Sequence, residues 1–280
     1  MGSSDHQQTI ATPDARRQTP DAVGASRANW HTHTFRCKHA SGDVADYARA
    51  AVAAGLTTLG MSDHAPLPDG VWPEYRMGPE ELPGYVAAVR AAQADFPGLR
   101  IALGLECDWS PAWDDWYRHL QQEHGFDYLI VGCHATPWQG DWIDSFGDLT
   151  DDARVEAYAD YCVAVMESGH FAALTHPDVL GVSVAAWTPA HDLAARRIAR
   201  AARTTGTALE LNGNGLRKPA RWGRPSYPWR PFWDAVAEEG GVRVIVSSDA
   251  HQPEHVVSGM DVLERWRLDL GLALADDLTR

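Results

Sequence analysis

Residues 128–134, YLIVGCH, form a short apolar run that ends at a histidine. An apolar run followed at once by ionisable side chains recurs as LGMSDH at 59–64, IALGLE at 101–106, AALTH at 172–176 and VIVSSDAH at 244–251. Apolar runs of this length indicate buried strands. Ionisable groups at the end of a buried strand are costly unless they are paired or bind a metal. The pattern therefore predicts strands that deliver polar groups to a common site.

Amphipathic stretches separate the apolar runs. We expect seven strands, near 29–33, 57–61, 101–105, 128–132, 171–175, 208–211 and 242–246. Helices are expected near 44–54, 80–95, 113–124, 151–168, 189–204 and 231–239. Strict alternation of strand and helix favours parallel pairing, in a barrel or a doubly wound sheet. Polar residues at the carboxyl ends of the strands favour an α/β barrel, because all those ends open on one face, where such folds build active sites.

Composition excludes several classes of protein. The 280-residue chain is 45% hydrophobic, yet no apolar run reaches the roughly 18 residues of a membrane span. Its net charge of −14 disfavours nucleic-acid binding. The four cysteines form no CxxC pair and the N-terminus has no apolar signal region, so we expect a cytoplasmic protein. Residues 1–27 are expected to be a disordered leader and 28–280 a single domain, whose oligomeric state the sequence does not indicate.

The pair His31 and His33 is the first candidate metal site. Alternate residues of a strand point to the same side, so both imidazoles can reach one cation. Six of the seven expected strands end in a histidine, aspartate or glutamate, a repetition that predicts a centre with more than one metal ion. Mixed imidazole and carboxylate ligands suit zinc, manganese or iron.

The motifs, in their order along the chain, resemble those of the polymerase and histidinol phosphatase (PHP) superfamily. They are HTHTFRCKHASG at 31–42, GMSDHAPL at 60–67, GLECDW at 104–109, VGCHATP at 131–137, LTHPD at 174–178 and SSDAH at 247–251. The resemblance implies a distorted seven-stranded (β/α)7 barrel with its metal site at the carboxyl ends of the strands. It covers nearly all of residues 29–260.

The resemblance also implies a ligand set for two or three divalent ions. One ion would be held by His31, His33, Glu106 and Asp249. Glu106 would bridge to a second ion held by His134 and His176, and a third would be held by His39, His64 and His251. A hydroxide between two such ions would attack a phosphorus in line and displace an alcohol. Asp63, Glu106 and Asp249 are the candidate catalytic acids, and Asp63 could orient a ligand, relay a proton or be structural.

Within the superfamily, three stretches resemble the stand-alone histidinol phosphatases: CKHASG at 37–42, RMGPEELPGYVAAVRAAQ at 76–93 and ELNGNGLRKP at 210–219. The last stretch brings Arg217 and Lys218 toward the metals, and the resemblance implies that Arg217 binds phosphate. A guanidinium matches phosphate oxygens well. We therefore expect a metal-dependent phosphatase of a small phosphorylated substrate, with L-histidinol phosphate leading.

One departure from the family leaves alternatives open. These phosphatases usually carry a basic residue shortly after the histidine aligned with His176, whereas the run 176–187, HPDVLGVSVAAW, has none. Arg221, Arg224 or another side chain could substitute, or the enzyme could act on another small phosphoester of a specialised pathway. Iron-dependent redox chemistry on the same scaffold is a further alternative. Tryptophans near strand ends, Trp138 among them, could line a wider substrate pocket, whereas Asp141 and Asp144 are interpreted as solvated loop charges.

Overall fold

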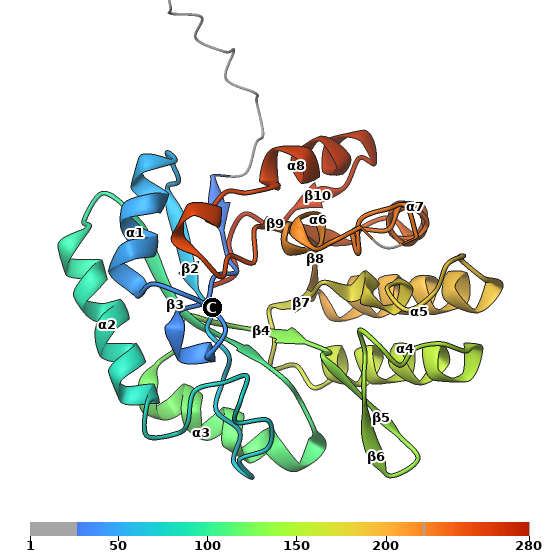
Figure 1. The fold of residues 1–280 in the computed structure, drawn as a ribbon, viewed down its shortest axis with the longest axis horizontal. Helices are drawn as coiled ribbons and strands as arrows, with labels where there is room; N and C mark the ends of the chain where they lie inside the picture. Colours follow the sequence, from blue (N-terminus) through green and yellow to red (C-terminus); the bar gives the residue numbers. More distant parts are fainter. Residues whose placement is uncertain (1–26, 221, 280) are drawn as a thin grey trace, which may run out of the picture.

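A computed structural model describes residues 27–220 and 222–279. Its main sheet has eight parallel strands in the order β1-β2-β3-β4-β7-β8-β9-β10. Figure 1 shows the strands at the centre of the molecule with helices on both sides. The bounds of the strands are Ala28–Asn29, Thr58–Met61, Arg100–Cys107, Tyr128–Gly132, Ala173–Thr175, Ala208–Asn212, Arg243–Ser247 and Ala273–Leu274.

The sheet curls so that its first strand meets its ninth. Thr32, just after β1, forms a parallel bridge with Ala250, just after β9. The His33 N–H donates to the Ala250 carbonyl at 2.9 Å, and the Ala250 N–H donates to the His31 carbonyl at 3.3 Å. This closure agrees with the expected distorted barrel and brings the first and last motifs of the chain together on one face.

Alternation along the strands divides the side chains between two cores. On β3, Leu103 and Leu105 belong to the large core, whereas Ala102 belongs to a small second cluster. Tyr128 and Ile130 of β4 also belong to the second cluster, which includes Trp30. Seven of the eight strands, or the residues directly after them, contribute to this cluster. Because residues two apart share a face, Ala102 and Glu106 lie on the same side of β3. On this side of β3, the buried apolar Ala102 is therefore followed by the acidic Glu106 toward the carboxyl end of the strand.

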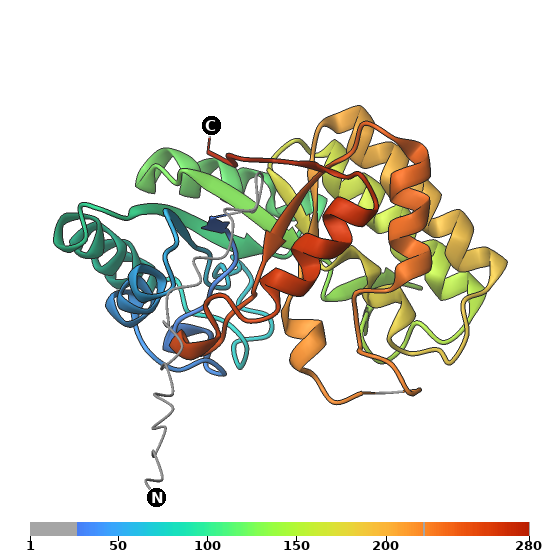
Figure 2. The same ribbon diagram turned by 90° about the horizontal axis from the view of Figure 1, so that it is seen from above.

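Helices cover the outside of the barrel, α1 to α3 on one side and α4, α5, α7 and α8 on the other (Figures 1 and 2). Local signals place their ends: Asp43 and Asp46 form a capping box at the start of α1, and Gly206 ends α5 in a left-handed conformation. The bounds of α1 to α8 are Val44–Ala53, Leu82–Asp95, Asp114–His124, Asp152–Glu167, Pro189–Thr205, Asn214–Arg217, Arg230–Glu239 and Met260–Asp269. Short 3₁₀ helices span Phe35–Cys37, Pro111–Trp113, Pro177–Gly181 and Pro253–His255.

The seven expected strands and six expected helices are confirmed, with ends shifted by a few residues, but the strand count was too low. The short β10 adds an eighth strand by pairing with β9. A hairpin of β5 (Ala135–Trp138) and β6 (Asp141–Asp144) was also missed. Its two-residue loop, Gln139 and Gly140, has positive φ at both positions, the geometry that matches the twist of the flanking strands. Helices α6 and α8 were not expected either.

The expected leader and the expected absence of a membrane span concern the ends and the surroundings of the chain. The leader expected over 1–27 lies, except for Arg27, outside the described residues, so its disorder and the single domain over 28–280 stay predictions. Among the helices described, none has the length and apolar character needed to cross a bilayer.

Candidate metal centre

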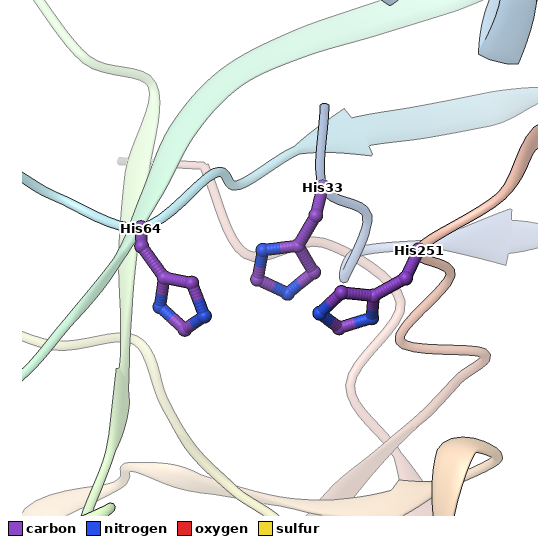
Figure 3. A group of neighbouring side chains, drawn as sticks. All are labelled: His33, His64 and His251. Carbon is purple, nitrogen blue, oxygen red and sulfur yellow. The ribbon is translucent and has the colours of Figure 1, made fainter. Parts of the chain in front are cut away.

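All nine expected ligands lie at the carboxyl ends of the strands, where the barrel closes. They follow six different strands of the sheet, so residues more than 200 positions apart become neighbours. Figure 3 shows the imidazoles of His33, His64 and His251 side by side, each carried by a different segment. His31, His33, His64, Glu106, His176 and Asp249 are buried, His134 and His251 are partly buried, and His39 is exposed.

The four side chains assigned to the first ion converge tightly. The Nε2 atoms of His31 and His33 lie 3.0 Å apart. Oδ1 of Asp249 lies 3.3 Å from Nε2 of His33 and 3.6 Å from Nε2 of His31. Oε2 of Glu106 lies 3.1 Å from Nε2 of His31. Nitrogen and oxygen lone pairs thus surround one point, as a cation requires.

Glu106 also faces the second expected group. Its other oxygen, Oε1, lies 3.4 Å from Nε2 of His134 and 3.3 Å from Nε2 of His176. The hydroxyl of Thr175 donates to the same oxygen at 2.9 Å. One carboxylate therefore presents one oxygen to each group, which is the geometry of a bridging ligand.

The third expected group is less compact. The ring centres of His39 and His251 lie 4.8 Å apart and those of His39 and His64 lie 5.4 Å apart. Ligand atoms of His33, His64 and His251 all lie within 4.8 Å of one another (Figure 3), and so do those of Cys37, His39 and His251. The structure thus also brings Cys37 to this group, which the sequence analysis did not.

The charges of the cluster are strongly coupled. Burial lowers the pKa of His33, but the neighbouring carboxylates of Asp249 and Asp63 outweigh it and raise that pKa to about 9. Burial also lowers the pKa of His134, but the carboxylates of Asp108 and Glu106 outweigh it and raise that pKa to about 10. Burial raises the pKa of Glu106, but the neighbouring imidazoles hold it well below its usual range. The carboxylates therefore stay ionised and attract positive charge.

Several buried atoms of the cluster lack protein partners. Nδ1 of His33, Nδ1 of His64, Nδ1 of His176 and Oδ1 of Asp249 have no hydrogen-bond partner among the described residues. At Asp249 the contrast is sharp, because Oδ2 accepts from the side-chain amides of Asn212 and Asn214 at 3.1 Å each. Unsatisfied buried polar atoms are rare in proteins. This donor set fits divalent cations, which would satisfy the converging nitrogens and oxygens.

Further carboxylates orient the ligands from behind. Glu210 accepts from Nδ1 of His31 at 2.8 Å, and Asp108 accepts from Nδ1 of His134 at 3.1 Å. Asp63 accepts from the backbone N–H of Thr34 at 3.0 Å and lies 3.6 Å from Nδ1 of His33. Such partners fix the ring orientation of metal-binding histidines. The sequence analysis named Asp63 but missed Glu210 and Asp108, although each acid interrupts or ends an apolar strand.

Backbone strain marks two ligand positions. His176 has φ 31° and Asp249 has φ 50°, in the left-handed region that residues with a side chain rarely adopt. Such strain costs about 1–3 kcal/mol per residue and persists only where the surroundings enforce it. At Asp249 the Arg217 guanidinium does so, because it donates to the Ser248 and Asp249 carbonyls at 2.8 Å each and to the Ser258 carbonyl at 3.1 Å.

A cavity of about 740 Å³ opens beside the ligands. Among the described residues, two cationic side chains line it, Lys218 and Arg76. Arg217, the expected phosphate ligand, is not among the lining residues and is engaged with backbone carbonyls instead. Trp138 is also not among them; Arg154 lies 5.9 Å from its ring, whereas Trp142 of the same hairpin lines the cavity. Roles for Arg217 and Trp138 in substrate binding stay predictions.

Of the two arginines that could replace the missing basic residue, only Arg224 lies among the described residues, and it is engaged elsewhere. Arg221 lies outside the described residues. Arg224 donates to the carbonyls of Gly181 and Val184 at 2.8 and 2.9 Å, and its guanidinium stacks on Trp229. The buried Arg76 donates to Asp108 at 2.7 Å and to the Ala65 carbonyl at 2.9 Å. Arg76 begins the stretch 76–93 that resembles the histidinol phosphatases, but no role was predicted for it from the sequence.

Comparisons with known proteins agree with this geometry. The family model described as PHP domain matches residues 29–214. A protein of Deinococcus radiodurans named "Probable histidinol-phosphatase" is 33% identical over 237 residues, which cover 81% of this chain and 86% of that protein. A "Probable phosphatase" of Acetivibrio thermocellus is 23% identical, over 79% of this chain and 78% of its own.

A solved structure shows the same fold. It is the histidinol phosphate phosphatase of Lactococcus lactis, complexed with zinc, L-histidinol and phosphate, with a TM-score of 0.71 and 15% identity. The match covers 89% of this chain and 95% of that one. The chain therefore belongs to the PHP domain family, among its histidinol-phosphatase-like, metal-dependent phosphatases, as the motifs indicated.

Proposed function

We propose that this enzyme hydrolyses a small phosphate monoester at the metal centre, with L-histidinol phosphate as the leading substrate and L-histidinol and phosphate as products. The observation that carries the proposal is the meeting of nine imidazole and carboxylate ligands, eight of which line one cavity together with two cationic side chains. The 33% identical relative and the Lactococcus lactis structure bear names that point to the same substrate.

We assign the ligands to the three sets that the family resemblance implies. In this proposal His31, His33, Glu106 and Asp249 hold one ion, Glu106 shares a second with His134 and His176, and His39, His64 and His251 hold a third. Divalent ions bound there, zinc, manganese or iron, would polarise the phosphoryl oxygens and make a water strongly nucleophilic near neutral pH. Glu106 and Asp249 supply the negative charge that holds the ions, and Asp63 orients His33.

Phosphate binding is assigned to Lys218 and Arg76. The Nζ of Lys218 lies 4.5 Å from the ring centre of Phe146 and 5.2 Å from that of Tyr227, beside the histidines of the second ion. Burial lowers the pKa of Lys218 despite the carboxylates Asp249, Asp144 and Glu106. A partly buried ammonium next to the metals is suited to neutralise a phosphate oxygen, and Arg76 offers a second cation where the family's residue after His176 is missing.

A different small phosphoester is the second candidate. No basic residue follows His176 in the run 176–187, and Trp72, Tyr75 and Trp142 give the cavity an aromatic lining. Both features favour a substrate other than L-histidinol phosphate. Both candidates share the same phosphate-releasing chemistry.

The test is a phosphate-release screen with purified protein loaded with Mn²⁺ or Zn²⁺. We expect the highest kcat/KM for L-histidinol phosphate among a panel of small phosphomonoesters that includes p-nitrophenyl phosphate. Preference for another ester would support the second candidate. No phosphate release from any member of the panel would refute both, and iron content with dioxygen consumption would favour redox chemistry instead.

A further inference from the structure

The β5–β6 hairpin forms one wall of the cavity. Ala135 of β5 and Trp142, Ile143 and Asp144 of β6 all line it. Asp144 pairs with Ala135, the residue directly after the ligand His134. The N–H of Ser145 donates to the His134 carbonyl at 2.9 Å. The hairpin therefore places Asp144 one strand pair away from the metal centre, within the reach of a small substrate.

Aromatic packing holds this wall in place. The ring of Trp142 stacks on Trp113 with centres 6.1 Å apart and planes 9° apart. It also meets Trp72 and Tyr161 edge to face, at 5.7 Å each. Aromatic pairs of this kind contribute about 0.5–1.5 kcal/mol each beyond burial. The hairpin is thus a fixed part of the site.

Asp144 differs from the other acidic residues of the cavity. Three acids line it, and Glu106 and Asp249 of these belong to the metal centre. One oxygen of Asp144 accepts from the backbone N–H of Phe146 at 2.9 Å. Among the ion pairs of the described residues, none includes Asp144. Its charge faces the cavity without a basic partner at contact distance.

The cavity carries charges of both signs, and the carboxylate of Asp144 acts on Lys218 although no ion pair joins them. Lys218 and Arg76, with the metal ligands, lie where a phosphate would bind, and Asp144 presents a negative charge on the hairpin wall. A carboxylate in a substrate cavity repels an anionic group and attracts a cationic one. Trp72 and Trp142 next to it provide aromatic faces that also favour an ammonium group or a planar ring.

We propose that Asp144 binds the ammonium group of the substrate, so that the enzyme selects phosphate monoesters of amino alcohols. This inference rests on the proposed function, because it assigns the part of the substrate that leaves as the alcohol. Asp144 is a specificity-determining residue in this assignment, and it lies at the exposed end of β6 rather than in a loop.

The experiment compares Asp144→Asn with Asp141→Asn. Both residues are exposed and lie on β6, but Asp141 does not line the cavity, and its side chain accepts from the Trp142 N–H at 2.8 Å. Asparagine keeps an oxygen that can accept from the Phe146 N–H, so the hairpin is preserved. The substrates are L-histidinol phosphate and its analogue without the amino group, and the protein is loaded with Mn²⁺.

We expect Asp144→Asn to lower the ratio of kcat/KM for the aminated over the deaminated ester by about 10–100-fold, mainly through KM, as the loss of a charged hydrogen bond does. Asp141→Asn should leave this ratio within about twofold. An unchanged ratio in Asp144→Asn overturns the inference, and so does an equal loss with both esters.

A binding measurement separates failure of the inference from failure of the proposed function. Calorimetric titration with L-histidinol and with the deaminated alcohol needs no turnover. Preferential binding of L-histidinol that is lost in Asp144→Asn supports the ammonium site even if no ester is hydrolysed. Equal binding of the two alcohols by the unmodified protein overturns the inference, whereas absence of phosphate release overturns the proposed function alone.

Discussion

Oε1 of Glu210 lies 2.8 Å from Nδ1 of His31, and the other oxygen of the same carboxylate accepts from the backbone N–H of His176 at 3.1 Å. Both residues are buried. Glu210, on β8, thus holds one ligand that follows β1 and another that follows β7. Since a histidine that donates through Nδ1 presents its Nε2 lone pair to a metal, this contact prepares His31 for metal binding.

Glu210→Gln should weaken metal binding about 10–100-fold, the usual effect of losing a carboxylate behind a histidine ligand. The measurement is the dissociation constant for Zn²⁺ or Mn²⁺ by competition with a chromogenic chelator. Glu156→Gln, on the exposed face of α4, is the matched control and should not change it. An unchanged dissociation constant in Glu210→Gln would show that His31 needs no such support.

Lys218→Ala should impair substrate binding, whereas Arg217→Ala should impair stability and metal binding. Lys218 lines the cavity, so its loss should lower kcat/KM for phosphate esters about 10–100-fold while metal content is retained. Arg217 holds the Ser248 and Asp249 carbonyls, so its loss should lower the free energy of unfolding by about 1.5–3 kcal/mol and weaken metal binding. Metal analysis and denaturant unfolding of both variants check this. The reverse pattern would return the phosphate-binding role to Arg217.

Metal binding should release protons at pH 7. Before a cation binds, His33 and His134 hold protons, since their pKa values are raised to about 9 and about 10. A metal requires neutral imidazole, so it must displace these protons, and the apparent affinity should rise from pH 6 to pH 9. Calorimetry at pH 7 in buffers of different ionisation enthalpy measures the release. A binding enthalpy independent of the buffer would contradict this.

Gly104→Ala should destabilise the barrel. A Cβ on Gly104 would lie 2.4 Å from Cε1 of Tyr128, a fully buried side chain whose hydroxyl donates to the Trp30 carbonyl at 2.8 Å. Overpacking of this kind costs about 1–3 kcal/mol. Gly98→Ala is the control, because nothing lies within 4 Å of its Cβ position. Chemical unfolding of both variants should separate them, and equal stabilities would show that Tyr128 can move at little cost.

Local sequence patterns predicted the strands well because apolar runs and turn residues act over a few positions. The strand ends at Met61, Gly132 and Thr175 were predicted to within one residue, and the helices between them followed from amphipathic spacing and caps. The hairpin was missed because its strand Ala135–Trp138 contains a proline and is followed by exposed residues, so it lacks the apolar run that marks a buried strand. The short β10 forms only because β9 offers an edge.

The sequence by itself determined the chemistry of the metal centre. Nine candidate ligands stand at or after strand ends, and in a parallel barrel all these ends must share a face, so their meeting follows from local pattern and topology together. Only the tertiary structure decided which neighbouring side chains face the substrate. Lys218 lines the cavity and Arg217 does not, and Asp144 lines it on a hairpin. Glu210 lies behind His31, 179 positions away. Such orientations depend on contacts between distant segments, which the local pattern of a single sequence does not encode.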